Sequence, residues 1–219
     1  MPSPPVFVLN ATPSVASGFL ADLRSTERQG NRLRFRRNVE RVGELLAYEV
    51  SKTLPYRPQT ITTPLDQLTV DALEQSPVLI SVLRAGLPLH QGVLNYFDRA
   101  DSGFIGAYRQ PTTEHDFTIE ASYQALPPVA GRPLLLIDPM LATGRTLVRV
   151  LQLIAQQGTP SVVHVVSVIG SAPGVAHVHE QAPLPCSFWL GALDDHLNDQ
   201  SYIVPGLGDA GDLAFGPKL

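Results

Sequence analysis

Arg84, Arg109 and Asp138 are polar residues that each stand directly after an apolar run of strand length. Runs without alternation, such as 78–83 and 134–137, are typical of strands buried on both faces of a parallel sheet. In open sheets of this kind, ligands bind at the carboxyl ends of the strands. The pattern therefore predicts that strand ends deliver two cations and an acid to one pocket.

The acid begins a loop that leads from a strand into a helix. The loop consists of Asp138, Pro139, Met140, Leu141, Ala142, Thr143, Gly144, Arg145 and Thr146. Apolar residues then recur at helical spacing from Leu147 to Ile154, which places the loop at a helix N-terminus. Free backbone amides and the positive end of the helix dipole gather there, which suits a phosphate group. No Gly-Lys-Ser/Thr follows, which excludes a Walker A site.

The C-terminal tail, residues 202–216, is rich in glycine and acids. Gly206, Gly208 and Gly211 match a literal G-x-G-x-x-G, but only eight residues follow Gly211. We therefore reject a dinucleotide-binding unit, which needs a following helix and strand. Glycines around acids make a tightly shaped loop whose backbone can approach a flat ligand closely, and a purely structural turn is the alternative.

The remaining reactive side chains favour structural roles. Cys186 lies in an apolar run, which predicts a buried thiol rather than a nucleophile. His177 and His179 could share one side of an extended segment, but no further ligand stands at metal-binding spacing, so we expect no structural zinc.

The chain has 219 residues, of which 44% are hydrophobic, and this composition is that of a globular protein with one core. We therefore expect a single domain over residues 1–219. The formal charge of −4 argues against a general nucleic-acid-binding surface. A single cysteine excludes an internal disulfide, and no run reaches the length of a membrane span. Without a signal peptide, the expected location is cytoplasmic.

Strands and helices alternate from Val78 onward, which predicts an α/β fold with a doubly wound, mostly parallel twisted sheet flanked by helices. We also expect a short helix at 65–73. Alternation in a polar region predicts a hairpin or flap at about 108–130, outside the main sheet. Residues 1–20 are expected to form a short edge segment or an arm on a neighbouring subunit.

A long amphipathic helix is predicted over 32–50, and arginines crowd its first half. These are Arg32, Arg34, Arg36, Arg37 and Arg41. We interpret them as a solvated face with salt bridges, some between subunits. The alternative is a patch that binds phosphate or an effector.

Four segments together resemble the uracil phosphoribosyltransferase family of type I phosphoribosyltransferases, from about Leu23 to Gly216. They are Leu83-Arg84-Ala85-Gly86, Gly106-Ala107-Tyr108-Arg109, Asp138-Pro139-Met140-Leu141-Ala142-Thr143-Gly144 and the tail from Tyr202 to Asp212. The resemblance implies the transfer of ribose 5-phosphate from 5-phosphoribosyl 1-pyrophosphate (PRPP) to uracil, which gives UMP and pyrophosphate.

The resemblance also implies roles for these residues. The implied catalytic set is Arg84, Arg109, Asp138 and Asp209. With these four, residues Pro139, Met140, Leu141, Ala142, Thr143, Gly144, Arg145 and Thr146 would bind PRPP. Uracil would contact Ile203, Gly208, Asp209 and Ala210. Mg²⁺ would arrive on the PRPP diphosphate near Asp209, without a protein ligand set of its own.

The chain departs from the family pattern at Arg145, where a second glycine is usual, and in the flap sequence. The resemblance suggests a homodimer or higher oligomer and leaves activation by GTP open. A regulator that senses UMP or PRPP and acts on RNA through the arginine-rich helix is an alternative. A purine-type transferase is disfavoured because the tail matches the uracil enzymes.

Overall fold

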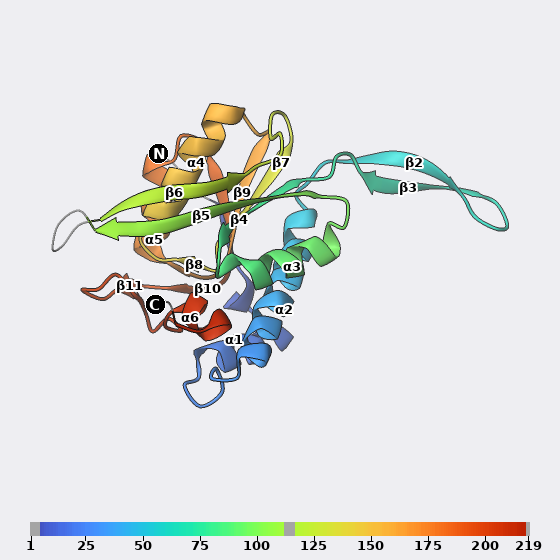
Figure 1. Ribbon diagram of the computed structural model, residues 1–219. Coiled ribbons are helices and arrows are strands. Elements are labelled where there is room, and N and C mark those ends of the chain that lie inside the picture. Colours follow the sequence, from blue (N-terminus) through green and yellow to red (C-terminus); the bar gives the residue numbers. More distant parts are fainter. Residues whose placement is uncertain (1–4, 112–116, 218–219) are drawn as a thin grey trace.

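The apolar runs of the sequence form the middle of an eight-stranded sheet (Figure 1). The computed structural model describes residues 5–111 and 117–217. The strand order is β1-β10-β9-β7-β4-β5-β6, with β8 beside β9, and only the β5–β6 pair is antiparallel. The predicted α/β class is therefore confirmed. The strands of this sheet are β1 (Val6–Val8), β4 (Val78–Leu83), β5 (Asp101–Pro111), β6 (Phe117–Ala125), β7 (Pro133–Ile137), β8 (Met140–Leu141), β9 (Val162–Ser171) and β10 (Cys186–Asp194).

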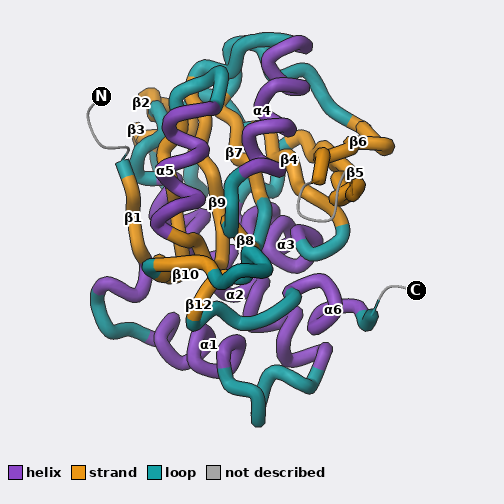
Figure 2. Tube along the Cα trace, turned by 90° about the vertical axis from the view of Figure 1, so that its left-hand side faces the viewer, coloured by secondary structure: helices purple, strands orange, loops and turns teal. Residues whose placement is uncertain are grey.

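Helices cover both faces of the sheet (Figure 2). On one face lie α1 (Val15–Arg24), α2 (Arg32–Ser51) and α3 (Gly86–Tyr96), preceded by the short 3₁₀ helix η1 (Leu9–Ala11). The other face is covered by α4 (Arg145–Gln157) and α5 (Ala172–Gln181). None of the helices in the described part of the chain is long and apolar enough to cross a membrane.

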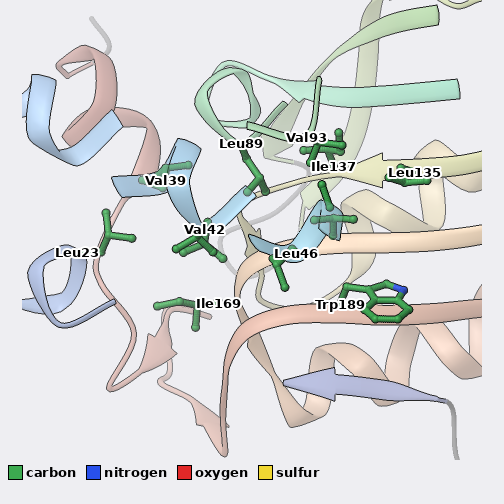
Figure 3. Close-up of a cluster of buried hydrophobic side chains, with 14 of the residues drawn as sticks. Leu23, Val39, Val42, Leu46, Leu89, Val93, Leu135, Ile137, Ile169 and Trp189 are labelled. Carbon is green, nitrogen blue, oxygen red and sulfur yellow. The ribbon is translucent and has the colours of Figure 1, made fainter. Parts of the chain in front are cut away.

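The central strands bury side chains on both faces, as the runs without alternation predicted. In β7, Leu135 and Ile137 pack into the cluster under α2 and α3, which Figure 3 shows. Leu134 and Leu136 pack into the cluster under α4 and α5. Each fully buried leucine contributes roughly 2 kcal/mol of hydrophobic stabilisation. The sheet is therefore a rigid platform for the loops at its carboxyl edge.

The helix predicted at 65–73 is wrong. This region is the second strand of a hairpin, in which β2 (Tyr56–Thr62) pairs antiparallel with β3 (Gln67–Leu73) away from the body of the molecule (Figure 1). The spacing of the leucines mimicked a helical face. The β-branched Thr69 and Val70 instead pair with Thr60 and Gln59 across the ribbon, and such residues favour strands.

The hairpin predicted at about 108–130 is present, but its placement outside the main sheet is wrong. β6 pairs antiparallel with β5 and forms the edge of the eight-stranded sheet. β5 also continues past Arg109 to Pro111, so this arginine lies within a strand and not at its end. Residues 112–116 and the side chain of Arg109 lie outside the described structure.

The first residues of the chain form an edge strand, one of the two alternatives that the sequence left open. β1 pairs parallel with β10, with Val6 opposite Phe188 and Val8 opposite Leu190. The N-terminal segment thereby closes the side of the sheet opposite β6.

Four of the five arginines of α2 have hydrogen-bond partners within the described part of the chain. Arg34 binds Asp22, Arg37 binds Glu40 and Arg41 binds the Asn38 side chain, while Arg36 donates to the Ala214 carbonyl. These contacts favour a structural role for the four arginines over an effector-binding patch, because their guanidinium groups already donate to acceptors of the protein itself.

Candidate functional site

The polar residues predicted at strand ends meet at the carboxyl edge of the sheet. Arg84 follows the last residue of β4, and Asp138 follows the last residue of β7. The two strands are neighbours in parallel register, with Ser81 opposite Ile137. Beyond β4, the backbone of Arg109 lies further along β5, whose Gly106 pairs with Leu83. The sheet therefore brings three predicted site residues to one edge.

The loop after Asp138 delivers backbone amides to the same edge. β8 first pairs with β9 beside Ile169 and Gly170, and Gly144 then forms the N-cap of α4 in a left-handed conformation, with φ of 75°. Arg145, which is exposed, begins the helix. The first amides of a helix have no acceptor within the helix, and a glycine cap offers no side chain to bind them. Anions bind at such helix N-termini.

Ser171, at the end of β9, holds the phosphate-type loop against α5. Its hydroxyl donates to the Ala142 carbonyl at 2.7 Å and accepts from the Gly174 amide at 2.9 Å. A Cβ on Gly174 would lie 2.1 Å from the Ala142 oxygen, so the two backbones are in direct contact. Sequence reasoning missed Ser171, although a serine at the end of a buried strand is a signal for such a cap.

The tail forms a turn and then a short helix. β11 (His196–Leu197) pairs with β12 (Ile203–Val204), and two glycines with positive φ follow before Asp209 caps α6 (Ala210–Phe215). Asp209 Oδ1 accepts from the Asp212 amide at 3.0 Å. A helix does therefore follow these glycines, contrary to expectation, but it is one short C-terminal helix without a further strand. Of the predicted uracil contacts, Ile203 and Ala210 are buried, while Gly208 and Asp209 are exposed.

Arg84 joins the tail to the strand ends. Its Nη2 atom donates to the Gly216 carbonyl at 3.3 Å and lies 3.8 Å from Asp212 Oδ1. A Cβ added at Gly211 would lie 4.0 Å from the Ala85 Cβ, so the tail passes close to the residue after Arg84. The side chain of Arg84 is 42% exposed, so it faces both the tail and solvent. The structure thus brings Arg84 and the tail together, which their separation in the sequence does not reveal.

Arg24 and Asp194 form a second connection to the tail that sequence reasoning missed. Two guanidinium nitrogens of Arg24 donate to the two carboxylate oxygens of Asp194, each at 2.8 Å. Both side chains also bond the backbone of Gly206. An acid at the end of an apolar strand could have indicated a paired charge, because a buried carboxylate needs a partner.

The cysteine and histidines have structural settings. Burial raises the pKa of Cys186 to about 12, which disfavours the thiolate that a nucleophile requires. His177 and His179 lie on α5 rather than on the extended segment that we expected. Within residues 5–111 and 117–217, no group of three or more His, Cys, Asp or Glu residues could hold a metal ion.

Solved structures define the fold class. A structure of the AQ2163 protein from Aquifex aeolicus matches with a TM-score of 0.86 at 27% identity, over 96% of this chain and 98% of that one. A purine phosphoribosyltransferase from Pyrococcus horikoshii matches with a TM-score of 0.50 at 13% identity, over 71% and 82% of the two chains. At that identity the likeness concerns the fold alone. The fold is that of the type I phosphoribosyltransferases.

Sequence comparison gives the family. The model of the uracil phosphoribosyltransferase family matches residues 11–217. A uracil phosphoribosyltransferase from Porphyromonas gingivalis is 42% identical over 214 residues, which cover 98% of this chain and 99% of the relative. One from Pyrococcus furiosus is 34% identical over 203 residues, or 91% and 85% of the two chains. The chain belongs to the uracil phosphoribosyltransferase family.

Proposed function

We propose that this protein is a pyrimidine-salvage enzyme that transfers the ribose 5-phosphate of PRPP to N1 of uracil. The products are UMP and pyrophosphate. Family membership over nearly the whole chain supports this activity, as do relatives of that name, one of which is 42% identical.

The observation that carries the proposal is the contact of Arg84 with the tail. A cation at a strand end is suited to the diphosphate of PRPP, and a glycine-shaped backbone is suited to a flat base. Arg84 bonds the Gly216 carbonyl and lies near Asp212, so the two kinds of site share one region. A transferase of this class needs such proximity, because the base must reach the carbon from which pyrophosphate leaves.

The residues would act by positioning and by charge stabilisation. Arg84 and Arg109 would bind the diphosphate as negative charge develops on it, and residues 142–146 would hold the 5′-phosphate. Asp138, half-buried at the end of β7, would accept hydrogen bonds from the ribose hydroxyls. Backbone groups of Ile203, Gly208 and Ala210 would recognise the edge of uracil. This division requires no covalent nucleophile.

Mg²⁺ would enter as part of the substrate, bound to the diphosphate of PRPP. The exposed carboxylate of Asp209 would lie on the side of the pocket that receives this metal-bearing diphosphate. One of its oxygens caps α6, which fixes the orientation of the group. The metal would neutralise charge on the leaving pyrophosphate, and Asp209 would orient that end of the substrate.

The proposal treats residues 1–219 as one cytoplasmic phosphoribosyltransferase domain that assembles into a homo-oligomer. The β2–β3 hairpin supports assembly, because Tyr56, Leu65 and Leu68 are exposed on a ribbon of two strands. Two-stranded ribbons are marginally stable without packing against further structure.

The activity is tested by incubating the protein with PRPP, Mg²⁺ and a panel of bases, with chromatographic detection of nucleotides. We expect UMP from uracil. In Arg84→Ala, kcat/KM should fall by about 100-fold or more, because a donor to developing charge is lost. Asp209→Ala should also reduce it strongly.

Arg99→Ala is the matched control for this assay. Arg99 is exposed between α3 and β5, at the edge of the sheet opposite the strand ends, and its loss should leave the rate unchanged. Turnover of a purine or orotate but not uracil would contradict the proposed function.

A further inference from the structure

Gly206 is held by a pair of oppositely charged side chains. Arg24 Nη1 donates to the Gly206 carbonyl at 3.0 Å, and the Gly206 amide donates to Asp194 Oδ2 at 3.0 Å. Arg24 and Asp194 are joined to each other by two hydrogen bonds of 2.8 Å. Both polar groups of one peptide position in the tail are thus bound by one ion pair.

The geometry of this ion pair is that of a rigid clamp. Asp194 is only 7% exposed and Arg24 is 23% exposed, so solvent competes weakly for their hydrogen bonds. The planar guanidinium donates along two parallel directions to the carboxylate and uses the same Nη1 for the Gly206 carbonyl. A lysine ammonium carries one point charge and cannot reproduce that fork.

The backbone at Gly206 has a conformation and a close contact that only glycine fits. Its φ is 58°, and a Cβ would lie 2.1 Å from the Ile203 carbonyl oxygen. Gly206 therefore folds back onto Ile203, one of the proposed uracil contacts, and Gly208 follows two residues later. A shift of Gly206 would move both contacts together, because the turn is continuous between them.

The side chain of Gln29 also binds the tail, one residue after Gly206. In the amide orientation that satisfies both groups, the Gln29 nitrogen donates to the Leu207 carbonyl at 2.9 Å and to the Leu23 carbonyl at 3.0 Å. Gln29 and Arg24 both belong to the segment between the last residue of α1 and the start of α2. This N-terminal segment therefore holds two consecutive carbonyls of the tail.

We propose that Arg24 and Asp194 are positioning residues for the base, which set the tail turn at Gly206 and thereby the affinity for uracil. The inference rests on the proposed function, since it names which part of that site the pair controls. Neither side chain needs to touch a substrate. The pair acts through the backbone of residues 203–208, while the phosphate-type loop is braced separately by Ser171.

The test compares Arg24→Lys and Asp194→Asn with Arg34→Lys. Arg34 is the matched control, because it also makes two hydrogen bonds to an aspartate, Asp22, but does not contact the tail. For each protein we would measure KM for uracil, KM for PRPP, the melting temperature, and hydrogen–deuterium exchange of the peptide 203–209. The exchange readout follows the Gly206 amide directly and does not depend on turnover.

Arg24→Lys should raise the uracil KM by about tenfold, the expected scale for a lost hydrogen bond to a charged group. The PRPP KM should stay unchanged, and exchange in 203–209 should accelerate. Asp194→Asn should act in the same direction, and the double variant should be no worse than the stronger single variant, because the pair works as a unit. Arg34→Lys should change none of these quantities.

An equal rise of both KM values, or a lower melting temperature with unchanged uracil KM, would overturn the inference. So would the same uracil effect in Arg34→Lys. If Arg24→Lys does not fold, Asp194→Asn, which keeps the shape of the side chain, decides by the same criteria. If the unaltered protein forms no UMP, the proposed function fails, and the exchange data alone decide whether the pair holds the tail.

Discussion

The phosphate-type loop and the base-type tail are supported over very different sequence distances. Ser171, which braces the loop at Ala142, is 29 residues away from it. The tail is held at Gly206 by Arg24, 182 residues away, and at Ala214 by Arg36, 178 residues away. The loop and its brace thus lie in consecutive elements of the chain, from β8 through α4 and β9 to α5. Asp194 binds the Gly206 amide from only 12 residues away, but the contacts of Arg24 and Arg36 form only when the two ends of the chain have come together.

This contrast suggests that the two substrates depend on separate supports. Substitutions near Gly144, Ser171 and Gly174 should raise the KM for PRPP. Substitutions near Gly206 should raise the KM for uracil. Each of the following substitutions tests that division, and each has a control of the same residue type.

The largest effect is expected from Gly144→Ala, which should raise the PRPP KM by about 100-fold. Gly144 has φ of 75°, and a Cβ there would lie 2.7 Å from Val178 Cγ2 and 2.8 Å from the Gly174 carbonyl. The cap must therefore shift, and a displacement of about 1 Å at a substrate-positioning group costs on the order of 100-fold. Steady-state kinetics with varied PRPP measure it.

Gly18→Ala provides the control for that substitution. Gly18 lies within α1, with no heavy atom within 4 Å of its Cβ position. Alanine there should leave both KM values unchanged and stabilise the fold by about 0.4–1 kcal/mol. An unaltered PRPP KM in Gly144→Ala would show that the loop tolerates a different cap.

Gly206→Ala should raise the uracil KM by about tenfold or more, with little change for PRPP. The left-handed φ of 58° disfavours alanine, and its Cβ would clash with the Ile203 carbonyl at 2.1 Å. Gly30→Ala is the control, because Gly30 is exposed and its Cβ position is open. A PRPP KM that rises as much as the uracil KM would remove the separation between the two supports.

The smallest effect is expected from Ser171→Ala, which should raise the PRPP KM several-fold and lower stability by about 1–3 kcal/mol. The substitution leaves the Gly174 amide without its hydroxyl acceptor and the Ala142 carbonyl without that donor. Chemical denaturation and kinetics report the two effects.

Ser167→Ala is a close control for Ser171→Ala. Both serines are fully buried on β9, but Ser167 Oγ has no hydrogen-bond partner within the described residues. Its removal should be neutral or slightly stabilising. If the two alanines behaved alike, the brace at Ala142 would have no measurable role.

Much of the fold follows from local patterns. The strand predicted at 78–83 is β4, and the helix predicted over 32–50 is α2, which ends one residue later. These two predictions succeed because burial requires a recurring pattern of apolar residues. A strand buried on both faces gives a continuous apolar run, and a helix buried on one face gives apolar residues at helical spacing. The prediction for the hairpin at Tyr56–Leu73 was wrong, because its strands are largely exposed. With no face packed on the core, they do not show the alternation of apolar and polar residues that marks a strand.

The candidate site divides in the same way. The residue types at the strand ends indicated an anion pocket, because neighbouring parallel strands must deliver their carboxyl ends to one edge. No local pattern links Arg24 with Asp194, because their pairing depends on how α1 packs beside the end of β10.

The sequence by itself therefore determined the α/β sheet, the phosphate-type loop and the glycine-rich character of the tail. Each of these is indicated by a residue pattern within a short stretch of chain. Only the tertiary structure decided that Arg84 meets the tail and that Arg24 and Asp194 clamp Gly206. The physical reason is distance along the chain: a hydrogen bond between residues 182 positions apart depends on how the elements that carry them pack together.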